Sequence, residues 1–365
     1  MEQRIDPWKS FEVKDYGKLF SEFGIKPFEP FVKKLPNPPL LMRRGMVVGH
    51  RDFERIAEKI RKKEPFVMMT GLMPSGKFHL GHKMVAEQII YYQSLGANIF
   101  LCVADIEAYN MRGGTLESLK KVAIEEYLLN YIALGLKPEK CDFYFQSNRD
   151  APYYRLSKML AKRVTENEFR DVYGDVSPGK MFSVMTQVAD ILHPQLKEYG
   201  GIKDVVVPVG VDQDPHIRLT RDIAYRSREE FGFVPPASTY HKFLPGLKGG
   251  KMSSSDPLSY IALTDDPKTV KNKINKYAFS GGQPSIEEHR KKGGNPDVDV
   301  AYQILYASFE QDDKKIKKIH DDYKSGKLLT GELKQILVEK LTTFLEEHQK
   351  KREKARSQVD RFLKK

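Results

Sequence analysis

Long apolar runs and cysteines are scarce in this chain, and each shortage excludes a class of protein. Its 365 residues contain no run of roughly 18 consecutive apolar residues, so no membrane-spanning helix is predicted. The charged N-terminus has no apolar stretch behind it, which argues against a signal peptide and favours a cytoplasmic protein. The two cysteines, Cys102 and Cys141, form no Cys-x-x-Cys pair, so structural zinc is not expected, and Cys102 is better interpreted as a buried free thiol.

The charge is strongly basic. Lysine and arginine total 61 against 49 acidic residues, a net charge of +12 that favours a polyanionic partner such as nucleic acid. Basic residues dominate the last stretch, 348–365, although a solvated helix face is the simpler interpretation of any single lysine there.

Strand and helix patterns alternate through the middle of the chain. Apolar segments at 65–70, 98–105, 142–146 and 205–210 predict strands, and the periodicity of 79–95, 116–133, 153–163, 179–192 and 213–230 predicts helices. This alternation predicts an α/β fold with a Rossmann-like parallel sheet over 65–264 and ligands at the carboxyl ends of its strands.

The two ends of the chain differ from this middle part. Residues 1–64, with a Pro-rich stretch at 36–39, are expected to form an N-terminal appendage. Residues 268–279, 298–309, 312–325 and 330–362 all have helical periodicity with charged outer faces. A C-terminal α-helical domain is therefore predicted over 265–365.

The segment 70–82 joins a predicted strand to a predicted helix through a Gly- and Pro-containing loop. His79 and His82 share one face of the helix start, where unpaired backbone N–H groups favour phosphate binding. Both imidazoles can donate hydrogen bonds to an α-phosphate under attack, while Gly81 leaves room for an adenine ring. A phosphate and an adenine together indicate ATP, and Thr70 and Gly71, at the end of the strand, are expected to contact it.

Other interpretations of this segment are weaker. Residues 71–77 match the spacing of a P-loop up to its lysine, but Phe78 stands where the magnesium-binding hydroxyl would be. An isolated His-x-x-His is more often a pair of ordinary helix residues, and a metal pair would need nearby carboxylates. The whole pattern Pro-Ser-Gly-x-x-His-x-Gly-His is more specific than either histidine.

A second glycine-rich segment, 248–256, carries lysine and hydroxyl groups. Lys251 can follow the negative charge that develops on departing pyrophosphate, and Met252, Ser253, Ser254 and Ser255 are expected around the same phosphates. The alternative interpretation is a solvated Lys-Gly turn. Such turns are common, but a turn of that kind does not explain the whole run Lys-Met-Ser-Ser-Ser-Asp.

A third segment, 207–216, places polar groups after a buried strand that ends at Gly210. Asp212 is expected to accept hydrogen bonds from ribose hydroxyls, and Gln213 to hold an amino-acid substrate.

Together these segments resemble the signatures of class I aminoacyl-tRNA synthetases, known as HIGH and KMSKS, in the tryptophanyl/tyrosyl subclass. The motifs Val-Pro-Val-Gly-Val-Asp-Gln and Leu-Thr-Arg-Asp-Ile-Ala belong to this likeness, and C-terminal motifs such as Leu-Thr-Gly-Glu-Leu (329–333) are similar to tryptophanyl enzymes of the archaeal and eukaryotic kind. The resemblance implies a homodimeric enzyme that forms tryptophanyl-adenylate from tryptophan and Mg²⁺-ATP and charges tRNA(Trp), with no protein metal site. The helical domain would bind the anticodon arm.

The amino-acid pocket departs from that kind. Relatives usually carry Tyr and Gln at the positions of Met69 and Cys102, where both serve the indole N–H. The helix containing Asp190 instead resembles the bacterial tryptophanyl pattern, which implies that Asp190 accepts the indole N–H. We expect Met69, Val207 and Val209 to form the walls. Glu107 and Gln187 are expected to hold the substrate's ammonium group or to line the pocket.

Three alternatives stay open at this point. Archaeal tyrosyl enzymes have a similar Met-Gln-x-x-Asp pattern, although Ser183 replaces their usual Tyr. A small-molecule adenylyl transferase would not need the helical C-terminal domain. A synthetase-like protein that only binds RNA would not need both His79 and Lys251, which are present.

Overall fold

The computed structural model describes residues 20, 23–174, 177–250, 252 and 256–363. Its centre is a seven-stranded sheet in the order β1-β2-β7-β6-β3-β4-β5. The strands are β1 (Lys26–Pro27), β2 (Val47–Arg51), β3 (Val67–Leu72), β4 (Asn98–Val103), β5 (Cys141–Phe145), β6 (Val205–Gly210) and β7 (Ala237–His241). The five strands from β7 to β5 are parallel, which confirms the Rossmann-like sheet, whereas β1 and β2 add an antiparallel edge.

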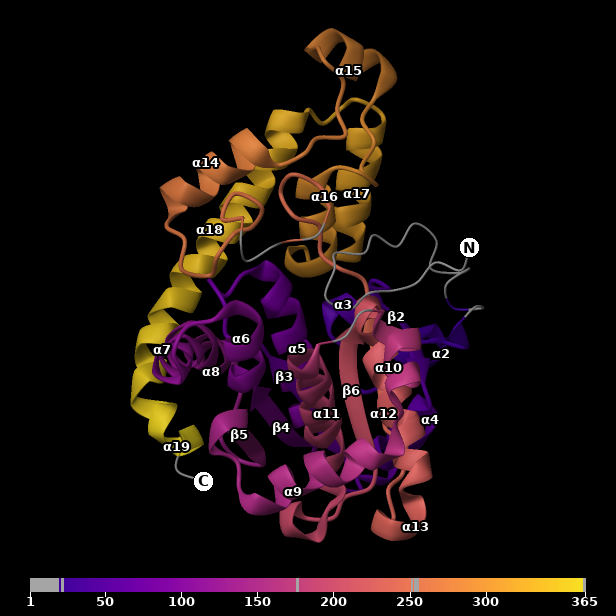
Figure 1. Cartoon of the computed structure of the whole chain (residues 1–365). Coiled ribbons are helices and arrows are strands. Elements are labelled where there is room, and N and C mark those ends of the chain that lie inside the picture. The colour runs from indigo at the N-terminus through magenta and orange to yellow at the C-terminus, as the bar shows by residue number, and fades with distance from the viewer. Residues whose placement is uncertain (1–19, 21–22, 175–176, 251, 253–255, 364–365) are drawn as a thin grey trace.

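One group of helices surrounds the sheet, and the C-terminal helices form a second group beyond its upper end (Figure 1). Those around the sheet are α2 (Glu29–Val32), α3 (Leu40–Arg43), α4 (Phe53–Lys62), α5 (Leu80–Ser94), α6 (Asp105–Arg112), α7 (Leu116–Val122), α8 (Leu129–Leu134), α9 (Ala151–Leu160), α10 (Glu166–Tyr173), α11 (Pro178–Leu192), α12 (Asp214–Arg226) and α13 (Arg228–Phe231). The C-terminal helices are α14 (Pro267–Tyr277), α15 (Ile286–Lys292), α16 (Val300–Ile304), α17 (Asp313–Lys324), α18 (Thr330–Ala355) and α19 (Val359–Leu363).

The alternation of side chains along the strands gives the sheet two different faces. Met68 and Leu101 point into the largest core, together with side chains of α5. Met69, Cys102 and Val207 point to the opposite face, where they meet Ile191 of α11 and Ile217 of α12. The predicted pocket residues Met69 and Val207 therefore share one face with α11.

The helix α18 joins the C-terminal helices to the sheet-containing part. It descends along one side of the molecule, and α19 ends beside β5 (Figure 1). Its buried Leu337 and Leu341 belong to the same core as Met68. No break in the described core therefore separates residues 265–363 from the sheet, and the boundary at 264/265 stays a prediction.

The described part of the predicted N-terminal appendage is built into the sheet. Phe28 packs edge-on against Phe53 with ring centroids 5.0 Å apart. Arg51 of β2 forms a buried ion pair with Asp214 at the start of α12, and Tyr240 of β7 donates to the same carboxylate at 2.5 Å. These contacts connect 23–64 to both β7 and α12.

The strands predicted at 65–70, 98–105, 142–146 and 205–210 are confirmed, and each end agrees to within two residues. The strand β7 was not predicted. Its sequence Ala-Ser-Thr-Tyr-His lacks an apolar run, yet all five residues are buried because strands and helices cover it on every side.

Candidate active site

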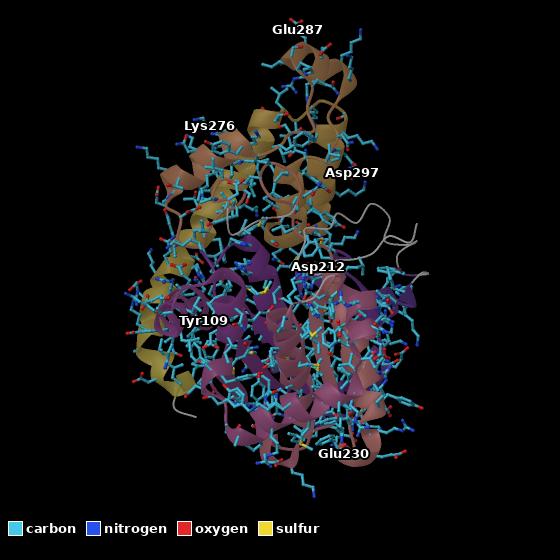
Figure 2. All side chains as sticks on the ribbon, viewed as in Figure 1. Tyr109, Asp212, Glu230, Lys276, Glu287 and Asp297 are labelled. Carbon is cyan, nitrogen blue, oxygen red and sulfur yellow. The ribbon has the colours of Figure 1, made fainter. Side chains whose placement is uncertain are left out.

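A cleft of about 850 Å³ opens at the carboxyl ends of β3 and β6. These strands are neighbours, but the chain proceeds from β3 toward β4 on one side and from β6 toward β7 on the other. Ligands bind at such a reversal in open α/β sheets because the loops of the two halves diverge there. Asp212, which follows β6, lies at the end of the sheet that faces the C-terminal helices (Figure 2).

His79 and His82 begin the helix that follows β3. His79 is the N-cap of α5, and its Nδ1 accepts from the Gly81 amide at 3.1 Å, while the His82 Nδ1 accepts from the His79 amide at 3.1 Å. The two rings lie 3.9 Å apart. Since each Nδ1 accepts, each ring carries its proton on Nε2.

Burial lowers the pKa of His79 to about 4, and burial together with the neighbouring His79 ring lowers the pKa of His82 well below its ordinary value. Both imidazoles are therefore neutral at pH 7. They can donate Nε2–H hydrogen bonds to a phosphate but do not contribute a positive charge.

The expectation that free backbone amides at this helix start bind phosphate is wrong for two of them. The Gly81 amide donates to His79, and the Leu80 amide donates to the Ile261 carbonyl at 3.2 Å. One amide donates to the capping side chain of His79 and the other to a carbonyl of the 259–265 segment, so both are already satisfied within the protein. The imidazole N–H groups are the donors that could serve a phosphate in their place.

Gly81 leaves little room for a side chain beside the His79 ring. A Cβ placed on Gly81 would lie 3.0 Å from the His79 ring and 3.6 Å from the sulfur of Met252. Met252 is 7% exposed and lines the cleft, so the second glycine-rich segment reaches the first. Lys251, Ser253, Ser254 and Ser255 lie outside the described residues; at the base of their loop, Lys248 pairs with Asp256 at 2.8 Å.

The end of β6 is tightly packed. A Cβ on Gly210 would lie 2.6 Å from an Asp212 carboxylate oxygen and 2.8 Å from the Phe243 ring. Asp212 is buried, Gln213 is the N-cap of α12, and both line the cleft. The side chains of Asp212 and Gln213 therefore lie at the carboxyl end of β6, where the sequence predicted ligand-binding groups.

Asp190 lies at the inner end of the cleft, on the face of α11 turned toward the sheet. Its Oδ1 accepts from the hydroxyls of Tyr144 and Tyr153, at 2.8 and 2.7 Å, and from the Cys102 thiol at 3.3 Å. Its Oδ2 accepts from the Gln146 amide at 2.7 Å. Burial raises the pKa of Asp190 against the lowering effect of these four donors.

Glu107, on α6, is the second carboxyl group of the cleft. Burial raises its pKa to about 7, and the Asp190 carboxylate adds to the effect. A carboxyl group that titrates near neutrality in a cleft is typical of a ligand-binding position.

The cleft brings together most of the residues that the sequence predicted. Fifteen of them line it: Met69, Thr70, Gly71, His79, Gly81, His82, Glu107, Gln187, Asp190, Val207, Val209, Gly210, Asp212, Gln213 and Met252. Lys77, the lysine of the P-loop alternative, does not line the cleft but pairs with Glu126 at 2.7 Å.

Several residues of the site were missed. Gln146 lines the cleft and directly follows β5, so the rule that ligands meet strand ends would have found it. Tyr144 and Tyr153 do not line the cleft but donate to Asp190, and they gave no signal because only folding brings their hydroxyls to that carboxylate. His241 ends β7, the strand that the sequence did not predict.

Two absences apply to the described residues alone. None of their helices is long and apolar enough to cross a membrane. No group of three or more His, Cys, Asp or Glu side chains among them is placed to hold a metal ion.

Comparison with known proteins gives consistent matches. The family model for class I tRNA synthetases (W and Y) matches residues 61–346. The tryptophan–tRNA ligase of Hyperthermus butylicus is 49% identical over 365 residues, covering 99% of this chain and 98% of the relative. That of Aeropyrum pernix is 48% identical, covering 97% and 96%. The crystal structure of tryptophanyl-tRNA synthetase from A. pernix K1 matches with a TM-score of 0.92 at 47% identity and 98% coverage of both chains.

Proposed function

We infer the function of this chain from the family to which it belongs, the class I tRNA synthetases for tryptophan and tyrosine. It is a tryptophan–tRNA ligase that activates L-tryptophan with ATP and transfers the tryptophanyl group to tRNA(Trp). The observation that carries this proposal is the meeting of His79, His82 and Met252 around one cleft whose inner end holds Asp190.

The first step is adenylate formation. The tryptophan carboxylate attacks the α-phosphorus of ATP, the bond to the bridging oxygen of the β-phosphate breaks, and pyrophosphate leaves. Nε2–H groups of His79 and His82 donate to the α-phosphate oxygens as negative charge spreads over them. Because both rings are already fixed by their Nδ1 hydrogen bonds, little reorganisation is needed.

Lys251 is assigned to the leaving pyrophosphate. What supports this assignment is Met252, the next residue in the sequence, which lines the cleft beside Gly81. Mg²⁺ enters on the triphosphate and neutralises part of its charge. Thr70, Gly71, Gly210 and Asp212 are assigned to the nucleoside, with the three serines of the same loop around the phosphates.

In the second step the terminal ribose hydroxyl of tRNA attacks the adenylate carbonyl and AMP leaves. The C-terminal helical region exposes lysines of α14 (Lys268, Lys271 and Lys276) and the apolar side chains Phe279 (52% exposed) and Ile286 (66% exposed). Lysines bind phosphates and exposed apolar side chains receive unstacked bases, so we assign these residues to the anticodon arm. Lys276 projects outward from α14 in Figure 2.

Specificity for tryptophan is assigned to Asp190. Oδ1 already accepts three donors, but Oδ2 accepts one, from Gln146, and so retains a lone pair for the indole N–H. Met69, Val207 and Val209 supply the apolar walls. Glu107 and Gln187 are assigned to the ammonium group, and Gln213 to the rest of the amino-acid backbone.

A second copy of the chain is the proposed partner of the α9–α11 face. These helices pack together, and each leaves a large apolar side chain exposed, Met159 at 36% and Phe182 at 68%. A Phe182→Glu variant should be monomeric by light scattering if this face forms the homodimer; a dimer of unchanged mass would rule the face out. A cytoplasmic location is proposed because that is where this tRNA substrate is charged.

ATP–pyrophosphate exchange tests the function. With tryptophan we expect exchange, and with tyrosine at least about 10-fold less, because the smaller phenol leaves part of the apolar walls uncovered. Exchange with tyrosine alone would transfer the assignment to the tyrosyl enzymes, and exchange with neither would refute a synthetase. Replacing Lys268, Lys271 and Lys276 by Ala should leave exchange unchanged and raise the KM for tRNA.

A further inference from the structure

A short segment behind His79 lies in the core without forming a regular element. Residues 260–263 are all at most 4% exposed, yet only one isolated bridge is assigned there, between His79 and Ala262. The Leu80 amide donates to Ile261 at 3.2 Å, and the Leu263 amide donates to Phe78 at 2.9 Å. The Tyr260 ring lies 4.9 Å from the His79 ring. This segment therefore forms the wall against which His79 rests.

The other side of the segment is held by Gln349 of α18. Its Nε2 donates to two carbonyl oxygens, that of Leu263 at 3.1 Å and that of Asp265 at 3.0 Å. Both amide hydrogens of one side chain are thus used on one turn of the segment. Gln349 does not line the cleft, so it does not contact a bound substrate directly.

Lys273 of α14 adds a second support. Its Nζ donates to the Tyr260 carbonyl at 3.1 Å and to the Asp265 carboxylate at 2.7 Å, and lies 5.1 Å from the centre of the Tyr260 ring. The same Asp265 carboxylate accepts from the Ala262 amide at 3.0 Å. Contacts from two C-terminal helices therefore converge on the segment that supports His79.

We propose that Gln349 is a positioning residue for adenylate formation, holding the 260–265 segment, and through it His79, in the geometry that meets the α-phosphate. The proposal rests on the function assigned above. The segment lacks a regular ladder of backbone hydrogen bonds, so its position depends on its burial, on the bonds to Phe78 and Leu80, and on the side-chain bonds from Lys273 and Gln349. A small displacement of a group aimed at a reacting phosphate has a large effect on rate.

Loss of Gln349 should leave the fold in place. The helix α18 buries Leu337, Leu341 and Leu345 in the main core, so it does not depend on one amide. The tryptophan pocket lies on the other face of the sheet, around Met69, and none of the residues 260–265 lines the cleft. The expected signature is therefore a loss of rate at constant tryptophan affinity.

The test uses the full-length protein with three variants. Gln349→Met keeps the length of the side chain and removes both donors, and we expect kcat for tryptophan-dependent exchange to fall about tenfold. Gln349→Lys keeps donors for both carbonyls and should return kcat to within about twofold of the wild type. Gln335→Met is the matched control, since Gln335 donates to Glu339 on the exposed side of the same helix. Tryptophan Kd, by calorimetry, should be unchanged in all three.

A double-mutant comparison separates positioning from general damage. In a His79→Ala background, Gln349→Met should lower kcat by less than about twofold, because the group it positions is gone. An equal loss in both backgrounds, a loss matched by Gln335→Met, or a fall in tryptophan affinity parallel to kcat would each overturn the proposal. Absence of exchange in the wild type would instead overturn the proposed function.

Discussion

Asp190 is the residue on which the assignment of tryptophan depends most directly. If its Oδ2 accepts the indole N–H, an amino acid that is isosteric with tryptophan but lacks this hydrogen should be activated poorly. The benzothienyl analogue of tryptophan, in which sulfur replaces N–H, meets this description. In the wild type a buried carboxylate would lose one charge-assisted hydrogen bond, worth about 1.5–3 kcal/mol, so kcat/KM should fall by about 10- to 200-fold.

The Asp190→Asn variant should change the ratio of kcat/KM for tryptophan to kcat/KM for the analogue. Its side-chain amide presents one oxygen and one NH₂ group to four donors, those of Tyr144, Tyr153, Cys102 and Gln146, so at least one donor loses its acceptor. Each buried donor left unpaired costs about 1–3 kcal/mol, and the free energy of unfolding should fall by that amount or more. The orientation that best serves the two tyrosines turns NH₂ toward Gln146 and the indole.

Pyrophosphate exchange with tryptophan and the analogue, measured on both proteins, gives the answer. The preference of the wild type for tryptophan should nearly vanish in Asp190→Asn, even though both rates fall. This ratio is insensitive to the fraction of folded enzyme, which cancels. An equal preference for tryptophan in both proteins would refute the role of Asp190 and move the indole contact to another residue of the pocket.

Three further predictions concern stability and geometry. Because burial raises the pKa of Glu107 from its ordinary 4.5 to about 7, the folded protein retains a proton that the unfolded chain releases above pH 4.5. Stability contributed by this group is thus lost as pH rises, and Glu107→Gln should be more stable than the wild type by about 3 kcal/mol at pH 8 and equal to it at pH 4, by urea unfolding; a constant difference would contradict this. Asp214→Asn should lower the free energy of unfolding by about 3 kcal/mol, because it leaves Arg51 half-buried without its ion pair; a loss below about 1 kcal/mol would mean that water already screens the pair. Gly81→Ala should reduce exchange about tenfold by displacing His79 while thermal stability holds or rises, since Ala favours helix; unchanged exchange would show that the ring adapts.

The order of elements was largely predictable because local patterns carry it. The apolar runs of β3, β4, β5 and β6 and the periodicity of α5 and α11 match the structure closely. The sequence did not predict β7, because its serine and threonine are polar and become buried only when neighbouring elements pack around them. It did not predict β2, because that strand lies within the segment expected to form an appendage. Pairing of distant segments leaves no trace in a local pattern.

The site divides in the same way. The sequence by itself predicted which side chains serve the phosphates, because the spacing of His79 and His82 and the run that begins at Lys251 are local features of a helix start and a loop. Only the tertiary structure decided how those groups are held. It showed that the Leu80 and Gly81 amides already have acceptors, that four side chains from three separate segments surround the Asp190 carboxylate, and that Gln349 supports the wall behind His79. Motifs record chemistry at fixed spacing, whereas hydrogen-bond partners far apart in the chain are selected only when the core closes around them.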